Sequence, residues 1–183
     1  MKVPPMVGAE FSDTDIEHAA RNGQLLSIEI ELSLLCNYRC QYSYVGPKGE
    51  TSAELSLDEI YDVILQAKEL GARKIIILGG EPMISPRIMA TLTFVRDQGL
   101  KSEIFTNGTS ITEEIAGRLY DLGVQVVLKM NSLDEIIQTE LAGVKAAHRT
   151  IQDAFRSLRT AGFPAEGHML AVSTIICTPN LPE

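Results

Sequence analysis

Two cysteines lie four residues apart in the segment Cys36-Asn37-Tyr38-Arg39-Cys40-Gln41-Tyr42-Ser43, in a chain of 183 residues that has three cysteines in all. A strand-like run precedes this segment, so the two thiols stand where a strand ends. Thiolates are soft ligands that suit zinc or iron–sulfur clusters, and a cluster normally takes several of them. The spacing therefore indicates a ligand loop, which we call the cysteine loop (residues 36–43).

A second motif with possible chemistry is Gly79-Gly80-Glu81-Pro82, which follows the apolar run Ile75-Ile76-Ile77-Leu78. Alone, a glycine pair after a strand is commonly a tight turn. Glycine also permits close approach of another backbone, and a carboxylate beside exposed carbonyls favours an ammonium group. We call this segment the glycine corner (residues 79–82) and take it as a candidate site for a cationic amino group.

The elements that must position these motifs follow a repeated strand–helix pattern. Alternation of Ile28, Ile30 and Leu32 with polar residues predicts a strand that carries Glu29 and Glu31 on its other face. Those two carboxylates point into a lumen or, if the strand lies at an edge, into water. Further strands are predicted at residues 75–78, 102–106, 124–129 and about 169–176.

Helix signals separate the predicted strands. A short helix is expected within an amino-terminal extension, residues 1–24, with Ser12 or Asp13 as its cap and Gly23 as its stop. After the cysteine loop, residues 46–49 predict a turn. Capping boxes are predicted for Ser56 with Glu59 and for Ser132 with Glu135, and Thr112 is predicted to cap a third helix.

Strands that alternate with helices at short spacing imply an α/β domain with a parallel sheet. In such sheets, chemistry gathers beyond the carboxyl ends of the strands. The segments at those ends are residues 36–43, 79–82, 106–108, 129–132 and 177–180. The cysteine loop and the glycine corner are therefore expected on one rim.

Composition limits the classes of partner and the cellular location that are expected. The formal net charge of −8 argues against nucleic acid, because phosphate binding needs clustered Lys and Arg. Hydrophobic residues make up 45% and charged residues 22%, as in ordinary soluble proteins, and no apolar run approaches the length of a membrane span. Three cysteines do not indicate a disulfide framework, so a cytoplasmic location fits best.

The two motifs resemble those of the radical S-adenosylmethionine (SAM) superfamily. Its cluster motif is Cys-x-x-x-Cys-x-aromatic-Cys, which Cys36, Cys40 and Tyr42 match, whereas Ser43 stands at the third cysteine. In that family, three thiolates hold a 4Fe–4S cluster whose open iron binds SAM. The glycine corner matches the family's Gly-Gly-Glu-Pro motif, which receives the amino group of SAM. The resemblance spans residues 26 to about 180.

This resemblance implies a parallel partial (β/α)6-type TIM-like barrel that cleaves SAM reductively to a 5′-deoxyadenosyl radical, which abstracts hydrogen from a substrate. Five strand–helix units are recognised, so the core at residues 25–183 is expected to be incomplete at its carboxyl end. The motif style is similar to the branch of SPASM-type peptide-modifying maturases and the molybdenum-cofactor cyclase. The sequence does not identify the substrate. By that analogy a peptide is a candidate substrate, and an electron donor such as a flavodoxin or a ferredoxin is expected.

The resemblance also assigns site residues. Cys36, Cys40 and Ser43 take the metal-ligand positions, and Tyr42 packs near adenine. The remaining cofactor-binding positions lie along the rim: Gly79, Gly80, Glu81, Pro82, Thr106, Asn107, Lys129, Asn131 and Ser132.

Ser43 decides which activity is expected. A serine hydroxyl is a hard donor that resists deprotonation, so it should hold iron less well than a thiolate and leave a weak or incomplete cluster. The serine is compatible with an engineered change or with natural divergence. Two alternatives stay open: a non-catalytic SAM-binding or scaffolding relative, and a two-thiol zinc or redox loop on an ordinary α/β domain.

Cys177 follows the fifth predicted strand, and we expect it to be a buried or lining thiol rather than a replacement ligand. His18, His148 and His168 have no partner at ligand spacing and are expected to be surface or packing residues.

Overall fold

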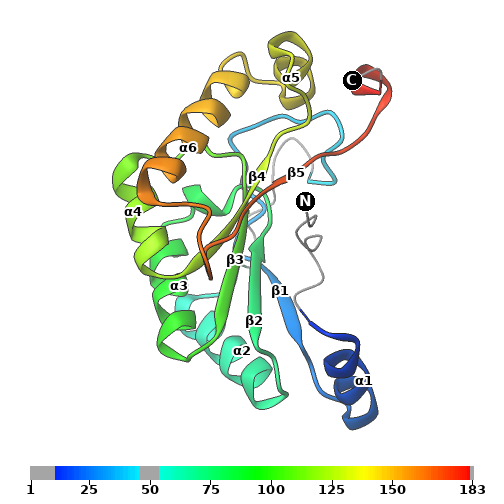
Figure 1. The fold of residues 1–183 in the computed structure, drawn as a ribbon, viewed down its shortest axis with the longest axis vertical. Helices are drawn as coiled ribbons and strands as arrows, with labels where there is room; N and C mark the ends of the chain where they lie inside the picture. Colours follow the sequence, from blue (N-terminus) through cyan, green and yellow to red (C-terminus); the bar gives the residue numbers. More distant parts are fainter. Residues whose placement is uncertain (1–10, 46–53, 182–183) are drawn as a thin grey trace.

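Five parallel strands form one sheet in the order β1-β2-β3-β4-β5 (Figure 1). Their bounds in the computed structural model, which describes residues 11–45 and 54–181, are β1 (Ser27–Glu31), β2 (Lys74–Leu78), β3 (Lys101–Thr106), β4 (Val124–Lys129) and β5 (Leu170–Ser173). Each strand pairs with the next one in the sequence, as expected from repeated strand–helix–strand units. The predicted α/β class is confirmed, while the turn expected at residues 46–49 lies outside the described residues.

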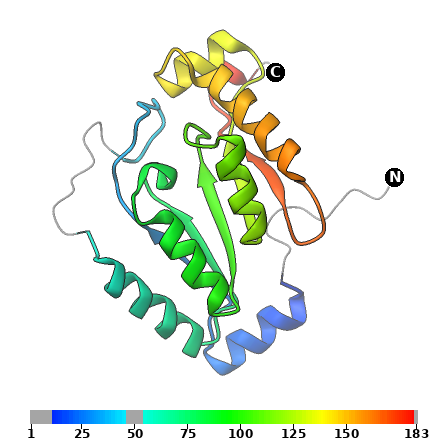
Figure 2. The ribbon, with the colours of Figure 1, turned by 90° about the vertical axis from the view of Figure 1, so that its left-hand side faces the viewer.

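The helices are α1 (Asp13–Asn22), α2 (Leu57–Glu69), α3 (Ile88–Asp97), α4 (Glu113–Asp121), α5 (Glu135–Ala142) and α6 (Ala147–Ala161), with short 3₁₀ turns η1 (Pro82–Ile84) and η2 (Thr178–Asn180). Figure 2 shows α2, α3, α4 and α6 covering one face of the sheet, with α1 at the amino ends of the strands and α5 beyond their carboxyl ends. No helix in the described part of the chain is long and apolar enough to cross a membrane.

Most predicted caps are confirmed, and one is wrong. Ser12 caps α1, Ser56 and Glu59 form the capping box of α2, and Thr112 caps α4. At α5 the cap is Asp134, whose Oδ1 accepts the backbone N–H groups of residues 136 and 137 at 2.8 and 3.0 Å. Ser132 Oγ instead accepts the N–H of Asp134 at 2.9 Å, so the helix begins later than predicted because the carboxylate satisfies two of its first free donors.

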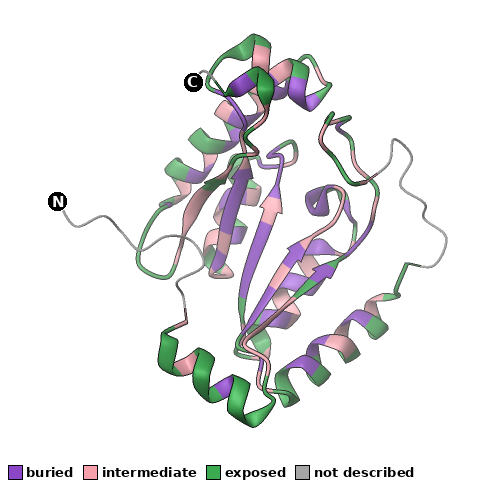
Figure 3. Cartoon of the chain, turned by 90° about the vertical axis from the view of Figure 1, so that its right-hand side faces the viewer, coloured by how far each residue is buried: buried purple, intermediate pink, exposed green. Residues whose placement is uncertain are grey.

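The core lies between the sheet and its helices. Strand side chains on this covered face are apolar and buried: Ile30, Ile75, Ile77, Ile104, Val126 and Leu128. Figure 3 shows the opposite face, which the helices leave open. Ile76 and Leu78 lie on that open face and are only partly buried, so the prediction that β2 is buried on both faces holds for one face alone.

Charged residues occupy the open face. Lys74 of β2 and Glu103 of β3 form a buried ion pair at 2.5 Å. Glu29 and Glu31 lie on the same face of β1, but they are exposed because β1 is an edge strand. The carboxylates of Glu29 and Glu31 therefore lie on the open face of the sheet and are in contact with water.

β5 is shorter than predicted because side chains replace the strand ladder beyond Ser173. Asn131 Oδ1 accepts the N–H of Ile175 at 2.9 Å, and Asn180 Nδ2 donates to the Ile175 carbonyl at 2.9 Å. The segment therefore leaves the sheet while its backbone groups stay paired.

Candidate functional site

The glycine corner packs directly against the segment that enters the cysteine loop. Gly80 N–H donates to the Ser33 carbonyl and Glu81 N–H donates to the Leu35 carbonyl, both at 2.9 Å. A Cβ atom on Gly80 would lie 2.1 Å from the Leu35 carbonyl oxygen, so only glycine permits this approach. The two motifs therefore share one rim, as the sequence predicts.

Glu81 is 2% exposed, and its carboxylate ties β2 to β3. Oε1 accepts the Met83 N–H at 3.0 Å and the Thr106 hydroxyl at 2.6 Å, and Oε2 accepts the Asn107 N–H at 2.6 Å. Burial raises the pKa of Glu81, and these hydrogen bonds oppose that rise. A carboxylate has about four acceptor positions, so protein donors occupy most of those of Glu81. Its predicted contact with a ligand ammonium stays a prediction.

The cysteine loop is held by the end of α5, about a hundred residues later in the chain. Arg39 N–H donates to the Ala142 carbonyl and Gln41 N–H donates to the Leu141 carbonyl, both at 3.1 Å. Gly143, which ends α5 in the left-handed conformation, is close enough that an added Cβ would lie 2.5 Å from the Arg39 carbonyl oxygen. Backbone contacts with α5 therefore fix the position of the loop.

The two thiols of the loop are both half-buried. Cys36 Sγ accepts the backbone N–H of Tyr38 at 3.4 Å. Burial raises the pKa of the Cys36 thiol, the negative charge of Glu81 adds to the rise, and the Tyr38 N–H opposes it.

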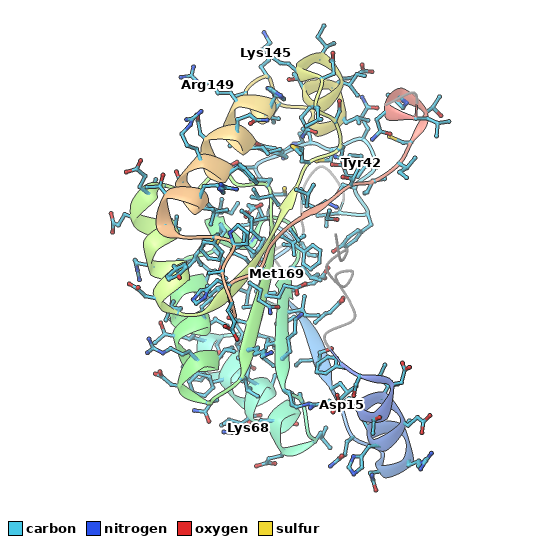
Figure 4. All side chains as sticks on the ribbon, viewed as in Figure 1. Asp15, Tyr42, Lys68, Lys145, Arg149 and Met169 are labelled. Atoms are coloured by element: carbon cyan, nitrogen blue, oxygen red, sulfur yellow. The ribbon has the colours of Figure 1, made fainter. Side chains whose placement is uncertain are left out.

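Tyr42 links the cysteine loop to the other side of the rim. Figure 4 shows it near the carboxyl ends of the strands, between α5 and the segment that leaves β5. Its hydroxyl accepts a hydrogen bond from Asn131 Nδ2, and burial raises its pKa. Asn131 also accepts from Ile175, and its carbonyl accepts from Asn180 Nδ2 at 2.6 Å. Asn131 is thus a buried junction of three segments.

A cavity of about 210 Å³ lies between the two motifs. Ten residues that the sequence assigns to the site line it: Cys36, Cys40, Tyr42, Ser43, Gly79, Gly80, Glu81, Thr106, Asn107 and Lys129. Ligand pockets usually measure about 300–1,000 Å³, so this cavity is smaller than a typical ligand pocket. The structure brings both motifs to one cavity.

Three predicted cofactor positions do not line the cavity. Pro82 is buried in η1, beside the lining. Asn131 and Ser132 border a neighbouring depression with Leu133 and Ile176 instead. Their predicted contacts with SAM stay predictions, and Asn131 reaches the cavity only through Tyr42.

Sequence reasoning missed seven lining residues: Tyr38, Tyr44, Leu78, Phe105, Gln138, Ala142 and Ile175. Leu78 and Phe105 could have been found, because each lies one residue before a rim segment on the open face of its strand. Gln138 and Ala142 carried no local signal, because they enter the site only through the docking of α5 on the cysteine loop.

Polar groups of β3 and β4 complete the cavity wall. Lys129 Nζ donates to Ser173 Oγ at 3.0 Å, and burial lowers the pKa of Lys129. Asn107 Nδ2 donates to Asn37 Oδ1 at 2.8 Å and so joins the rim of β3 to the cysteine loop. A cation and several hydrogen-bonding groups suit a polar ligand that carries a carboxylate.

The donor set does not match three-thiolate ligation of a 4Fe–4S cluster. Within residues 11–45 and 54–181, no group of three or more His, Cys, Asp or Glu side chains could hold a metal ion. Ser43 lines the cavity, but its hydroxyl accepts the Val45 N–H at 3.1 Å. Cys177 is half-buried and is not among the lining residues, so the three predicted ligand positions offer two thiols and one serine hydroxyl.

The histidines agree with their predicted packing role where contacts are described. His168 stacks on Tyr120 with ring centroids 3.9 Å apart.

Curated relatives cover most of this chain. A probable GTP 3′,8-cyclase of Sulfolobus acidocaldarius is 26% identical over 130 residues, which are 70% of this chain and 42% of that protein. An AdoMet-dependent heme synthase of Methanosarcina barkeri is 28% identical over 155 residues, which are 84% of this chain and 43% of that protein. The chain therefore spans less than half the length of these relatives.

Solved structures share the fold. Streptococcus suis SuiB bound to S-adenosylmethionine has a TM-score of 0.70 and 20% identity, with 92% of this chain and 41% of that chain covered. Native anSMEcpe with bound AdoMet has a TM-score of 0.66 and 16% identity, with 81% of this chain and 43% of that chain covered. The predicted partial TIM-like barrel is thus confirmed.

The description of the matching family model is "Radical SAM superfamily", a family whose cofactors are a 4Fe–4S cluster and SAM. Because that match covers residues 30–183, which include the cysteine loop and the glycine corner, the chain belongs to the Radical SAM superfamily.

Proposed function

We propose that this chain is a SAM-binding radical SAM core that holds its 4Fe–4S cluster weakly, because Ser43 takes the third ligand position. The supporting observation is that the cysteine loop and the glycine corner line one cavity. The hydrogen bonds of Gly80 and Glu81 to the segment before Cys36 keep these two motifs together.

The residues of the cavity suit SAM. Lys129 would attract the carboxylate of the methionyl group, and the remaining acceptor position of Glu81 would receive its amino group. Thr106 already donates to Glu81, so its part is to orient that carboxylate. A bound cluster would supply the electron for SAM cleavage, and Cys36 and Cys40 are the thiols available to hold it.

The decisive experiment is Ser43→Cys with anaerobic reconstitution. We expect wild-type chain to bind iron below full cluster occupancy, and S43C to gain iron and visible cluster absorbance because a third soft ligand is present. Ser157→Cys is the matched control, since it adds a thiol on α6, away from the cavity. Equal iron content in S43C and S157C would refute the assignment of Ser43.

A second candidate function is a non-catalytic SAM-binding relative, which the lack of a third thiol at the cavity favours. This candidate predicts SAM binding by the iron-free chain and no 5′-deoxyadenosine from reconstituted S43C. The enzyme proposal predicts 5′-deoxyadenosine from S43C in the presence of a reductant. Stoichiometric zinc without SAM binding would favour the two-thiol zinc loop instead.

A peptide substrate stays a prediction from the sequence. It is supported by the structures of SuiB bound to the precursor peptide SuiA and of anSMEcpe with bound AdoMet and the Cp18Cys peptide. A flavodoxin or ferredoxin donor and a cytoplasmic location also remain part of the proposal, and the three free cysteines support a reducing environment.

A further inference from the structure

Gln138 is a polar side chain buried at the edge of the cavity. It belongs to α5, is 1% exposed and is one of the lining residues. Its Oε1 atom accepts the backbone N–H of Asn131 at 2.8 Å and that of Ser132 at 3.1 Å. This oxygen therefore fixes the segment between β4 and α5.

The other half of the same amide has no such partner. Gln138 Nε2 carries two N–H donors, and no acceptor within residues 11–45 and 54–181 takes a hydrogen bond from it. Gln138 Nε2 is not one of the fully buried side-chain atoms that lack a partner in the described residues, so it keeps some accessible surface through which a ligand can reach it. Because Oε1 is bound to the β4–α5 segment, the free donor belongs to the part of the side chain that borders the cavity.

We propose that Gln138 is a ligand-recognition residue, whose Nε2 group donates to an acceptor atom of the SAM molecule in this cavity. The inference rests on the proposed function for the identity of the ligand. The bound oxygen orients the amide before the ligand arrives, so the donor is presented with little loss of side-chain freedom. Gln138 thus joins the β4–α5 segment to the ligand.

Gln138→Glu separates the two halves of the amide. Glutamate keeps an oxygen for the N–H groups of Asn131 and Ser132, but it places a second oxygen where the Nε2 donor was. We expect a modestly lower urea midpoint, because a carboxylate is buried there, and a SAM affinity reduced about tenfold or more, beyond what this loss of stability explains, because acceptor would face acceptor. Gln152→Glu, on α6 and outside the lining, is the matched control and should keep wild-type affinity.

Gln138→Met tests the structural role of the Gln138 oxygen, which accepts two backbone N–H groups. Methionine cannot accept the two backbone N–H groups well, so we expect a lower urea midpoint than for Gln138→Glu. If the loss of SAM affinity follows the loss of stability in both variants, the role of Gln138 is purely structural. That result would overturn the proposal.

Binding is measured by calorimetry on the iron-free full chain, with SAM and with methylthioadenosine, which lacks the amino-acid end. If Gln138→Glu loses affinity for SAM but not for methylthioadenosine, the acceptor atom belongs to the amino-acid end of SAM. A loss for both ligands assigns it to the nucleoside, and either result supports recognition by Gln138. Equal affinities of wild type and Gln138→Glu refute this inference. Failure of the wild-type chain to bind either compound, both iron-free and after anaerobic reconstitution, refutes the proposed function instead.

Discussion

The glycine corner and the cysteine loop meet at one cavity, but they are built in different ways. In the glycine corner, Gly79 and Gly80 fit against the backbone of residues 33–35, and the Glu81 carboxylate is buried with three donors. In the cysteine loop, the two thiols are half-buried and Ser43 is exposed, while backbone bonds to α5 fix the course of the chain. Close backbone packing defines the glycine corner, whereas backbone hydrogen bonds to α5 define the position of the cysteine loop.

Because of this difference, the residues that set the shape of the cavity are not the residues that would bind iron. Among the described residues, the hydrogen bonds that fix the rim do not depend on the side chain at position 43, whose hydroxyl accepts the nearby Val45 N–H. A substitution at position 43 should therefore leave the cavity intact, whereas a substitution in the glycine corner should disturb both segments.

Gly80→Ala should have the largest effect on stability, because it disrupts the close backbone packing of the glycine corner. The new Cβ would lie 2.1, 2.5 and 2.7 Å from backbone atoms of Leu34 and Leu35, which no side-chain movement relieves. We expect a loss of about 3 kcal/mol in the free energy of unfolding, measured with urea. Gly117→Ala in α4, where an added Cβ meets nothing within 4 Å, should gain about 0.5–1 kcal/mol. Equal stability of the two variants would contradict this view of the glycine corner.

Glu81→Gln should have the second largest effect. Both carboxylate oxygens accept hydrogen bonds, so an amide NH2 at either position would face the N–H of Met83 and the Thr106 hydroxyl or the N–H of Asn107. Facing donors should cost about 2 kcal/mol in the free energy of unfolding and weaken SAM binding. Glu166→Gln, at an exposed position between α6 and β5, serves as the control. A Glu81→Gln variant as stable as that control would show that the three bonds do not hold the rim.

The same comparison explains what the sequence could predict. The glycine corner was recognisable because its residue types are forced by close backbone approach, and the strand–helix alternation placed it beside the cysteine loop. The anchors of the cysteine loop were not recognisable, because Arg39 and Gln41 use backbone donors that any residue except proline would supply. Tertiary docking of α5 therefore brings in Gln138 and Ala142 without a motif.

Two polar residues show the same limit. Asn131 and Ser132 are predicted to contact SAM because they follow β4, and this stays a prediction. The sequence did not reveal that Asn131 also joins Tyr42, Ile175 and Asn180. Position along the chain places a residue at the rim. Which way its side chain turns depends on partners from the cysteine loop, from α5 and from the segment after β5, which local sequence does not reveal.

The base of the cysteine loop offers the smallest and most selective test. Glu54, which follows the loop, accepts hydrogen bonds from the Ser33 hydroxyl before the loop and from Arg87, and both interactions hold its pKa below the ordinary value of 4.5. A lowered pKa in the folded state stabilises the fold above the unfolded-state pKa, and this contribution is lost as the pH falls through the folded-state value.

Glu54→Gln should therefore lower the free energy of unfolding by less than about 1 kcal/mol near neutral pH, because this pair is partly exposed. The difference from wild type should shrink below about pH 4.5, the ordinary pKa of the group, in urea unfolding at a series of pH values. Amide exchange should rise more in the cysteine loop than in the glycine corner, because Glu54 binds the Ser33 side chain, whereas the Gly80 N–H is bound to the Ser33 carbonyl. A stability difference that persists at low pH, or exchange that rises equally in both regions, would mean that the two regions are not independently anchored.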